Sequence, residues 1–205
     1  MSEWYRPEST PAAITLIAAA LPADESARLA EAFQFAAAAH AGQVRDEGTP
    51  YIEHPVRVVS ILWDEIGKRE DPDLLIAALN HDVLEDCEWL PREVLVAAFG
   101  ERVTRIVEDV TKERVPEPQK AQRDRAYMDR LPGLPLHSRL LKLADRIDNL
   151  RSVRHSPDDE KAGRYLQVSR AEFIPLALAT DQTAARLVIE ACDELERDLR
   201  SRGIG

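Results

Sequence analysis

A histidine and an aspartate lie side by side at His81-Asp82, directly after the apolar run 74–79, and they are the residues best suited to chemistry in this chain. Burying two ionisable groups beside a core segment is costly unless something pairs with them. A divalent metal ion is a suitable partner, because imidazole and carboxylate ligands together suit ions such as Mn²⁺, Fe²⁺ or Zn²⁺. One histidine and one aspartate supply too few ligands, so we expect His54 and Asp145 to complete the site.

Two further carboxylates, Glu85 and Asp86, follow this pair. A helix would place Glu85 on the face of His81 and Asp82, because it follows them at spacings of four and three residues. Taken alone, His81-Asp82 has a structural alternative, namely a helix-terminal histidine beside a solvated aspartate. The clustering of four ionisable groups in six residues argues against that alternative, since they repel one another unless a cation compensates.

His54 and Asp145 are weaker candidates when each is taken alone. His54 lies in a Tyr-x-x-His-Pro turn, where an imidazole bonded to the backbone is the structural alternative. Asp145 lies in the apolar stretch 140–150 with Asn149 one turn later, and its alternative is to cap a helix or pair with Arg146. Together the three segments supply what each one lacks, so the sequence favours one shared site.

The composition is typical of a globular helical protein. Hydrophobic residues make up 44% of the chain and charged residues 31%, which argues against disorder. Alanine and leucine are plentiful and only 5% of residues are aromatic, which favours helices over sheet. The length of 205 residues suits a single domain, which we expect to cover 1–205.

Charge and cysteine content limit the partners and the location. The net charge of −10 argues against nucleic acid and anionic membranes as partners. A phosphorylated metabolite is compatible with it only if a metal ion and a local basic pocket are present. Cys87 and Cys192 are far apart in the sequence, which indicates a reducing compartment. The apolar segment 14–21 is too short to span a bilayer and follows no basic region, so we predict a cytoplasmic location.

Capping residues and prolines mark the starts of expected helices. Thr10-Pro11, Asp71-Pro72 and Ser156-Pro157 each place a capping residue before a proline, which suits the first helical position. We expect loops at 43–49 and 115–122, and no segment alternates as a strand would. The fold class is therefore predicted to be an all-α bundle. Its expected helices cover 11–20, 24–41, 54–66, 72–84, 93–99, 102–110, 136–154, 158–179 and 182–202.

Across 36–177 the chain carries a combination of motifs that resembles the hydrolase domain of the RelA/SpoT family. The motifs are Gly42-Gln43-x-Arg45, Gly48-x-Pro50-Tyr51-x-x-His54-Pro55, Ala77-Ala78-Leu79-x-His81-Asp82-x-x-Glu85-Asp86, Phe99-Gly100, Val110-Thr111 and Lys142-Leu143-Ala144-Asp145-Arg146-x-x-Asn149. The resemblance implies an HD-domain helical bundle with its motif-bearing core at 24–180. It also implies a stand-alone small alarmone hydrolase, because the chain has no room for the synthetase and regulatory domains of the long family members.

The resemblance implies a role for each matched residue at the metal. The ligands of a single ion, usually Mn²⁺ in this family, are matched by His54, His81, Asp82 and Asp145. Glu85 and Asp86 match the acidic pair that orients or deprotonates the attacking water. The implied reaction is metal-dependent removal of the 3′-pyrophosphate of (p)ppGpp, which gives GDP or GTP and pyrophosphate. The metal would lower the pKa of a bound water while a carboxylate takes the proton.

The implied partner is a small guanine nucleotide. Arg45 matches a basic residue that contacts this nucleotide, and Asn149 matches a residue near the nucleoside. Lys142 and Arg146 flank Asp145 at i, i+4 spacing, so we expect at least one of them to contact phosphate. The sequence does not specify an oligomeric state.

Two other functions remain open. One is an HD-type phosphatase of another nucleotide, such as NADPH or a nucleoside monophosphate. The other is a metal-free or inactive HD domain that senses a nucleotide. Arg45 and the Tyr-x-x-His-Pro string favour the alarmone over other nucleotides, and the complete set of ligand positions argues against an inactive domain.

Three residues depart from the family pattern. Asn80 stands where an aliphatic residue is usual, Cys87 replaces a threonine, and Phe173 stands where a tyrosine is common. His40 is expected to be a packed or half-exposed imidazole. Other charged or titratable side chains have no matched role or are expected on a solvated helix face: His137, His155, Arg123, Arg125 and Arg130.

Overall fold

The computed structural model describes residues 10–46 and 48–204. Within these ranges the secondary structure is helical, apart from turns and one isolated antiparallel bridge between Val44 and Pro50. The predicted all-α fold class is thereby confirmed. The chain divides into two compact units whose boundary falls between Thr111 and Lys112. The expectation of one domain over 1–205 stays a prediction.

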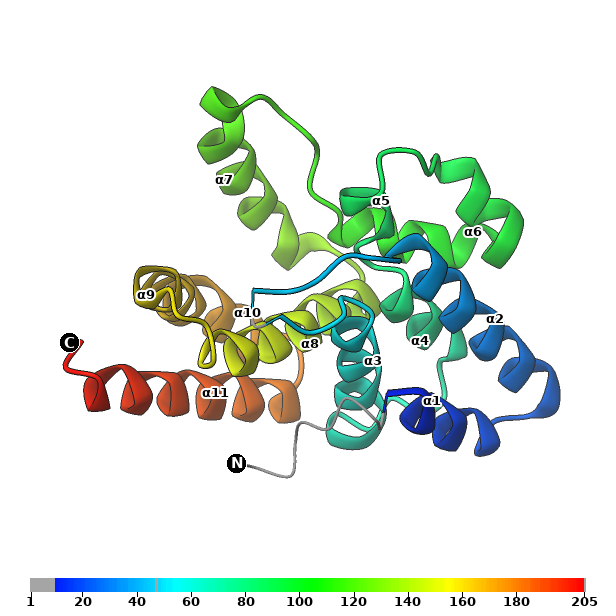
Figure 1. The fold of residues 1–205 in the computed structure, drawn as a ribbon, viewed down its shortest axis with the longest axis horizontal. Helices are drawn as coiled ribbons and strands as arrows, with labels where there is room; N and C mark the ends of the chain where they lie inside the picture. Colours follow the sequence, from blue (N-terminus) through cyan, green and yellow to red (C-terminus); the bar gives the residue numbers. More distant parts are fainter. Residues whose placement is uncertain (1–9, 47, 205) are drawn as a thin grey trace. The chain divides into compact units, whose positions relative to one another are not determined.

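The first unit is built around α4, whose residues 74–79 are buried. Its described helices are α1 Thr10–Ala19, α2 Ala23–Ala39, α3 Glu53–Ser60 with the π-helical turn η2 Ile61–Glu65, α4 Pro72–Leu79, α5 Val83–Asp86 and α6 Arg92–Val110 (Figure 1). Every residue of 74–79 is buried, and α4 packs against α2, α3 and α6. Burying one leucine such as Leu75 stabilises the fold by about 1.5–3 kcal/mol. The apolar run read from the sequence is therefore the centre of this unit.

The helix expected over 72–84 is interrupted, which corrects the prediction. α4 ends at Leu79, and Asn80 has the non-helical angles φ −112° and ψ 10°. The side-chain amide of Asn80 donates to the carbonyl of Ile76 at 2.9 Å, a local bond that competes with the helix ladder. The chain then turns through His81 and Asp82 before α5 begins. The interruption places the His-Asp pair in a tight turn between two helices.

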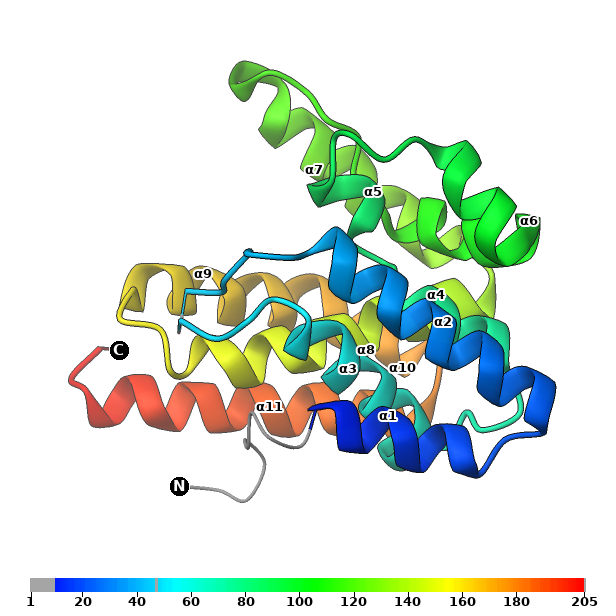
Figure 2. The ribbon, with the colours of Figure 1, turned by 45° about the vertical axis from the view of Figure 1, so that its right-hand side comes forward.

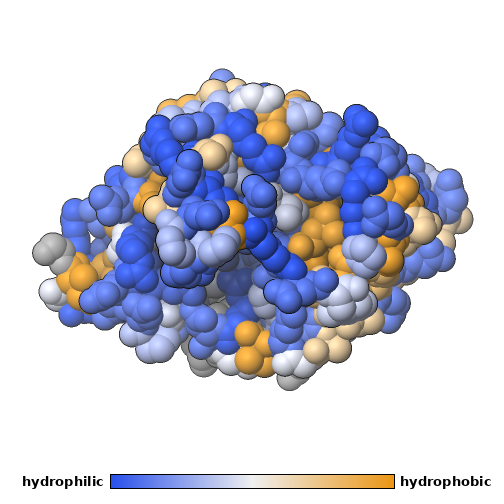
Figure 3. Space-filling view, turned by 90° about the horizontal axis from the view of Figure 1, so that it is seen from above, coloured by the Kyte–Doolittle hydropathy of each residue, from blue (hydrophilic) through white to orange (hydrophobic). Residues whose placement is uncertain are grey.

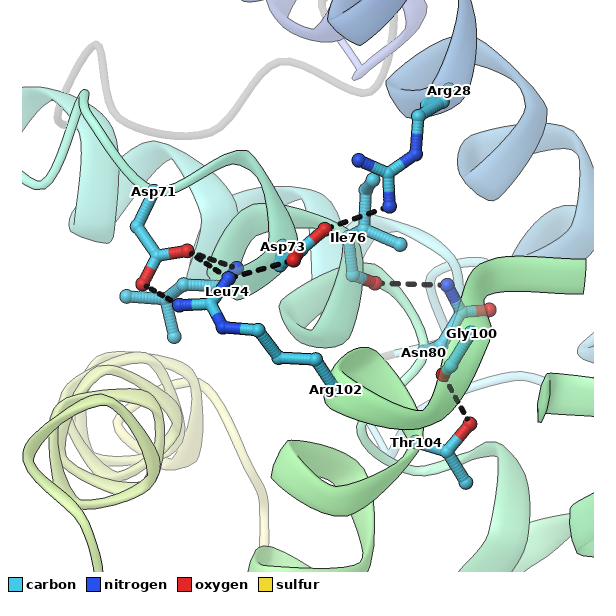
Figure 4. Close-up of polar contacts among 9 residues, drawn as sticks. All are labelled: Arg28, Asp71, Asp73, Leu74, Ile76, Asn80, Gly100, Arg102 and Thr104. Atoms are coloured by element: carbon cyan, nitrogen blue, oxygen red, sulfur yellow. Dashed lines mark hydrogen bonds and ion pairs between the residues drawn. The ribbon is translucent and has the colours of Figure 1, made fainter.

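The start of α4 is held by a cap and by a cluster of ion pairs (Figure 4). Asp71 accepts from the backbone N–H of Leu74 at 3.2 Å, with proline at the first helical position as expected. Arg102 donates to both Asp71 and Asp73, at 2.9 and 2.7 Å, and Arg28 reaches Asp73 at 2.7 Å. Burial alone would raise the pKa of Asp73, but Arg102 and Arg28 hold it below its ordinary value of 3.8. The cluster therefore stabilises the fold above that pH and weakens as the pH falls further.

α6 is divided by a sharp bend at Gly100, which agrees with the separate helices expected at 93–99 and 102–110. Gly100 has φ 84° and ψ 170°, a combination that only glycine adopts readily. Arg92 in the first half pairs with Glu101 and Glu108 in the second, the latter at 2.7 Å. The bend is thus fixed by one backbone position and braced by side chains.

Replacing Gly100 by alanine is expected to destabilise the protein by about 1–3 kcal/mol, because a side chain is strained at this positive φ. A new methyl group would meet no atom within 4 Å, so the cost would come from the backbone alone. Gly163 is a matched control, since it lies inside α9 and also has nothing within 4 Å. Urea unfolding should show Gly163→Ala unchanged or stabilised by up to about 1 kcal/mol. Equal midpoints for Gly100→Ala and wild type would contradict this interpretation of the bend.

The second unit is a set of helices around α8. Its elements are η3 Glu117–Gln119, α7 Lys120–Arg130, η4 Leu131–Gly133, α8 Leu136–Val153, α9 Asp159–Val168, η5 Ser169–Phe173, α10 Ile174–Leu178 and α11 Gln182–Ser201. α8 and α11 lie side by side, as both views show (Figures 1 and 2). The buried stripe of α11 matches the sequence pattern and comprises Ala184, Leu187, Val188, Ala191, Leu195 and Leu199.

Two expectations for this unit are wrong in detail. The predicted loop at 115–122 already contains the start of α7 at Lys120. The helix predicted over 158–179 is divided by the π-helical turn η5, which precedes Pro175. Proline has no N–H to donate to the preceding turn, so a regular ladder cannot continue through it, and a wide turn accommodates the change.

The surface agrees with the charged composition. Hydrophilic residues dominate the face shown in Figure 3, with smaller hydrophobic patches between them. Among the described residues, no helix combines the length and apolar character that crossing a bilayer requires. The predicted cytoplasmic location stays a prediction.

Candidate metal centre and basic pocket

Three of the four predicted metal ligands meet in the first unit. His54 lies on the first turn of α3, and His81 and Asp82 lie in the turn between α4 and α5. One ligand atom from each of the three lies within 4.8 Å of the others. Oδ2 of Asp82 lies 3.4 Å from Nε2 of His54 and 3.1 Å from Nε2 of His81. Both imidazoles are almost fully buried, at 1% and 2% exposure.

The hydrogen bonding of His81 suits a metal ligand. Its Nδ1 lies 2.8 Å from the carbonyl oxygen of Ala78, which can only accept, so Nδ1 carries a proton. This bond fixes the ring and turns Nε2 toward Asp82, as second-layer bonds do for metal-binding histidines. Burial alone would raise the pKa of Asp82, but His81 and His54 hold it well below its ordinary value. Two imidazole nitrogens and a carboxylate oxygen form a donor set that fits a divalent ion.

Asp145 lies in the second unit, in the middle of α8, and is 5% exposed. Nζ of Lys142 lies 2.7 Å from its Oδ2, and Nδ2 of Asn149 donates to its Oδ1. Burial alone would lower the pKa of Lys142, but Asp145 raises it well above its ordinary value. Both carboxylate oxygens are therefore oriented by side chains one turn away on the same helix. The roles of Asp145 as a fourth ligand, and of Lys142 and Asn149 as substrate contacts, stay predictions.

The two predicted catalytic carboxylates, Glu85 and Asp86, lie on the short helix α5, directly after the His-Asp turn. Desolvation, and then the charge of Asp82, raise the pKa of Asp86, while a hydrogen bond from Tyr51 opposes this. Burial, and then the charges of Asp82 and Asp86, also raise the pKa of Tyr51, so its hydroxyl remains a donor. Two carboxylates are thus available directly after the predicted metal ligands His81 and Asp82.

Arg45 lies on a loop that closes on itself. The isolated bridge between Val44 and Pro50 joins its two arms, and the N–H of Arg45 donates to the carbonyl of Thr49 at 2.9 Å. The guanidinium carbon of Arg45 lies 5.9 Å from the centre of the Tyr51 ring. The loop therefore holds Arg45, the predicted nucleotide contact, against the ring of Tyr51. The hydroxyl of Tyr51 in turn donates to Oδ2 of Asp82 at 2.7 Å.

The second unit contains a basic pocket of about 550 Å³. The cations that line it come from α7, α8, α9 and the segment before them: Lys112, Arg125, Arg146, Lys161 and Arg164. Among the described residues that line it, two are carboxylates, Asp124 and Glu172, and they pair with Lys112 and Arg125 at 3.3 and 3.5 Å. This is the local excess of positive charge that an acidic chain needs to bind a phosphorylated molecule.

Arg146 is fixed within this pocket by two aromatic rings. Its guanidinium carbon lies 4.8 Å from the centre of the Tyr165 ring and 4.0 Å from that of Phe173. Its Nε is buried and has no hydrogen-bond partner among the described residues. Phe173, one of the departures from the family pattern, is fully buried. The face of its ring packs against the guanidinium of Arg146 in a cation–π contact.

The other departures from the family pattern, Asn80 and Cys87, are both buried. Asn80 is fully buried and ends α4, while Cys87 is 2% exposed and donates to the carbonyl of Ala39 at 3.3 Å. His40 is packed, as expected, at 3% exposure. The unmatched histidines and the basic stretch are half-buried or exposed: His137, His155, Arg123, Arg125 and Arg130.

Sequence reasoning assigned no role to Tyr51, Tyr127 or the α9 residues of the basic pocket. Tyr127 is 4% exposed, and its ring contacts the cations of Lys112, Arg130 and Lys142. The sequence signal for Tyr51 is its place in the Tyr-x-x-His-Pro motif, three residues before the predicted ligand His54. The pocket cations come from separate helices, so no local pattern marks them.

Comparisons with known proteins identify the family of this chain. A family described as HD domain matches residues 32–196. The guanosine-3′,5′-bis(diphosphate) 3′-pyrophosphohydrolase MESH1 of Danio rerio is 39% identical over 142 residues, which cover 68% of this chain and 77% of that protein. The bifunctional (p)ppGpp synthase/hydrolase SpoT of Escherichia coli (strain K12) is 35% identical over 167 residues, covering 79% of this chain but 23% of SpoT.

A solved structure of a metazoan SpoT orthologue that hydrolyses ppGpp is similar in fold and sequence. It superposes with a TM-score of 0.72 at 29% identity and covers 87% of this chain and 97% of that one. The family match, these relatives and the clustered His54, His81 and Asp82 agree with one another. The chain therefore belongs to the HD domain family, as a relative of the guanosine-3′,5′-bis(diphosphate) 3′-pyrophosphohydrolases.

Proposed function

We propose that this protein hydrolyses (p)ppGpp, releasing the 3′-pyrophosphate and leaving GDP or GTP. The observation that carries the proposal is the convergence of His54, His81 and Asp82 within 4.8 Å, with Glu85 and Asp86 on the next helix. Its nearest functional support is the activity of the MESH1 and SpoT relatives.

Two groups of residues have different tasks in this reaction: one group binds the metal ion and the other transfers protons. A bound divalent ion supplies a water of lowered pKa and polarises a phosphoryl oxygen. His54, His81 and Asp82 would hold that ion, and Glu85 would take the proton of the attacking water. The bond that breaks joins the ribose 3′-oxygen to phosphorus, and one water is consumed. Asp86, whose pKa is raised, would carry a proton toward the leaving oxygen.

Two finer assignments belong to the same proposal. The ion is Mn²⁺, bound singly, as the resemblance to the RelA/SpoT hydrolase domain implies. Asp145 completes its ligands, which the match of 142–149 to the family motif supports. Lys142 and Asn149 then orient Asp145 through the bonds to its two oxygens. Second-layer bonds of this kind are common around metal ligands.

The basic pocket supports a substrate with several phosphates. Within residues 10–46 and 48–204, no carboxylate pairs with Arg146, and its guanidinium packs against Tyr165 and Phe173, so little conformational freedom is lost when it binds an anion. Arg164 and Lys161 line the same pocket. Cations gathered in this way are suited to binding the phosphates of a nucleotide.

Replacing Arg45 by alanine is expected to raise the KM for ppGpp more than it lowers kcat, with metal content unchanged. A guanidinium can stack on a base and attract phosphate, and neither contact is made only in the transition state. Arg105→Ala is a matched control, because Arg105 is an exposed arginine of the same unit that pairs with Glu101 at 3.6 Å. Steady-state kinetics that match wild type for Arg45→Ala would make Arg45 a solvated loop charge.

The proposal is tested by comparing initial rates on a nucleotide panel in the presence of Mn²⁺. The panel includes ppGpp, pppGpp, NADPH and nucleoside monophosphates. We expect ppGpp and pppGpp to be cleaved fastest. Faster cleavage of NADPH or a monophosphate would leave the metal chemistry intact and remove the alarmone assignment. Binding without turnover of any nucleotide would indicate a sensor.

A further inference from the structure

Tyr51 contacts both the metal centre and the Arg45 loop. Its hydroxyl donates to Oδ2 of Asp82 at 2.7 Å, the oxygen that faces both histidines. The same hydroxyl interacts with Asp86. Its ring contacts that of His54 edge-on, with centroids 6.0 Å apart. The guanidinium carbon of Arg45 lies 5.9 Å from the centre of the same tyrosine ring. One side chain therefore touches two proposed ligands, one carboxylate of the acidic pair and the proposed nucleotide contact.

The position of Tyr51 is itself fixed by His40, at the end of α2. The two rings are stacked, with centroids 4.6 Å apart and planes 25° from parallel. Nδ1 of His40 lies 2.7 Å from Oε1 of Gln43, which can only accept, so His40 donates this bond. The N–H of Tyr51 donates to the carbonyl of Gln43 at 3.0 Å. Backbone, ring and hydroxyl of Tyr51 are each held by a different contact.

The hydroxyl bond has a direct consequence for Asp82. A carboxylate can rotate about its terminal torsion, and only a fixed donor decides which oxygen faces the histidines. Hydrogen bonds from second-layer residues set the orientation of ligating carboxylates, and losing one typically costs about 10–100-fold in metal affinity or activity. Tyr51 supplies Asp82 with a donor from outside the histidine pair.

We propose that Tyr51 is a positioning residue whose hydroxyl orients Asp82 toward the metal and whose ring, backed by His40, ties the Arg45 loop to that carboxylate. The inference rests on the proposed metal centre and assigns separate tasks to two parts of one side chain. The hydroxyl sets metal affinity and turnover, whereas the ring sets the position of Arg45 and hence nucleotide binding.

The test is Tyr51→Phe, which removes the hydroxyl and keeps the ring. We expect the affinity for Mn²⁺ alone, measured by calorimetry on metal-stripped protein, to fall by about 10–100-fold. At saturating Mn²⁺ we expect kcat for ppGpp to fall while KM stays within about twofold of wild type, because the ring contact to Arg45 remains. Ser60→Ala is the control, since it removes a hydroxyl of α3 that donates to the carbonyl of Val56 in the same helix, at 3.1 Å.

A second pair of variants tests the ring. His40→Ala removes the ring that stacks on Tyr51 and should raise KM for ppGpp. His40→Phe keeps an aromatic ring at this position and should return KM most of the way to the wild-type value. Thermal melting of the metal-free proteins shows which variants are folded, and Tyr51→Phe decides the inference even if His40→Ala unfolds. Wild-type Mn²⁺ affinity and kcat in Tyr51→Phe would overturn the inference.

The outcomes separate this inference from the proposed function. Wild-type protein that binds no Mn²⁺ overturns both the metal centre and the role of Tyr51. Wild-type protein that binds Mn²⁺ but does not cleave ppGpp removes only the alarmone assignment. In that case the Mn²⁺ affinity of Tyr51→Phe still confirms or overturns the positioning of Asp82.

Discussion

Replacing His81 by alanine is expected to remove both the bound metal and the hydrolysis of ppGpp. His81 is 2% exposed, and its ring is fixed by the bond to Ala78, so its removal takes away one of the two oriented imidazoles of the cluster. Asp82→Ala should have the same effect, because it removes the anion that faces both imidazoles. Metal content by mass spectrometry and turnover should therefore fall together, to background.

The control for this prediction is His155→Ala, since His155 is an exposed histidine outside the metal centre. It should keep wild-type metal content and turnover. Full Mn²⁺ occupancy in His81→Ala or Asp82→Ala would show that these residues are not ligands. The charged cluster would then have only a structural role.

Replacing Glu85 by glutamine is expected to leave the metal bound and to lower kcat by about 10²–10⁴-fold, the usual contribution of a general base. The change keeps the shape of the side chain and removes its ability to accept a proton. Glu85 follows the metal ligands on α5 but does not belong to the cluster of ligand atoms. Metal content and kcat should therefore separate in this variant, in contrast to His81→Ala.

Two further variants locate the base. Glu88→Gln changes an exposed carboxylate just beyond α5 and should have no effect. Asp86→Asn tests the other member of the acidic pair. Near-normal turnover of Glu85→Gln with bound Mn²⁺, together with an inactive Asp86→Asn, would move the base to Asp86.

The sequence predicts helices best where apolar residues recur on a helix face that packs against the core. The stripe of α11 and the apolar run of α4 are buried as expected, because burial follows directly from hydrophobic spacing. The break at Asn80 was missed, since a side-chain bond to Ile76 ends the helix where propensity would allow it to continue. The π-helical turn before Pro175 was missed for a similar reason: the proline was visible, but the way the backbone adapts to it was not.

The candidate site shows the same division. His54, His81 and Asp82 could be predicted because each lies in a short motif whose residue types suit a metal. Arg146 was predicted from its spacing to Lys142, yet the rings that hold it come from α9 and η5. The basic pocket depends on how separate helices pack, and no local sequence pattern reports that. Tyr51 was visible in a motif, but its bond to Asp82 joins residues 31 positions apart.

The most direct test of the central proposal is to identify the products that metal-stripped and Mn²⁺-restored protein form from ppGpp. Anion-exchange chromatography separates GDP, pyrophosphate, inorganic phosphate and the partly hydrolysed nucleotides. The expected result is that stripped protein is inactive and that restored protein yields GDP and pyrophosphate in equal amounts. Release of inorganic phosphate with a shortened 3′ chain, or equal activity of the stripped protein, would contradict a metal-dependent 3′-pyrophosphohydrolase.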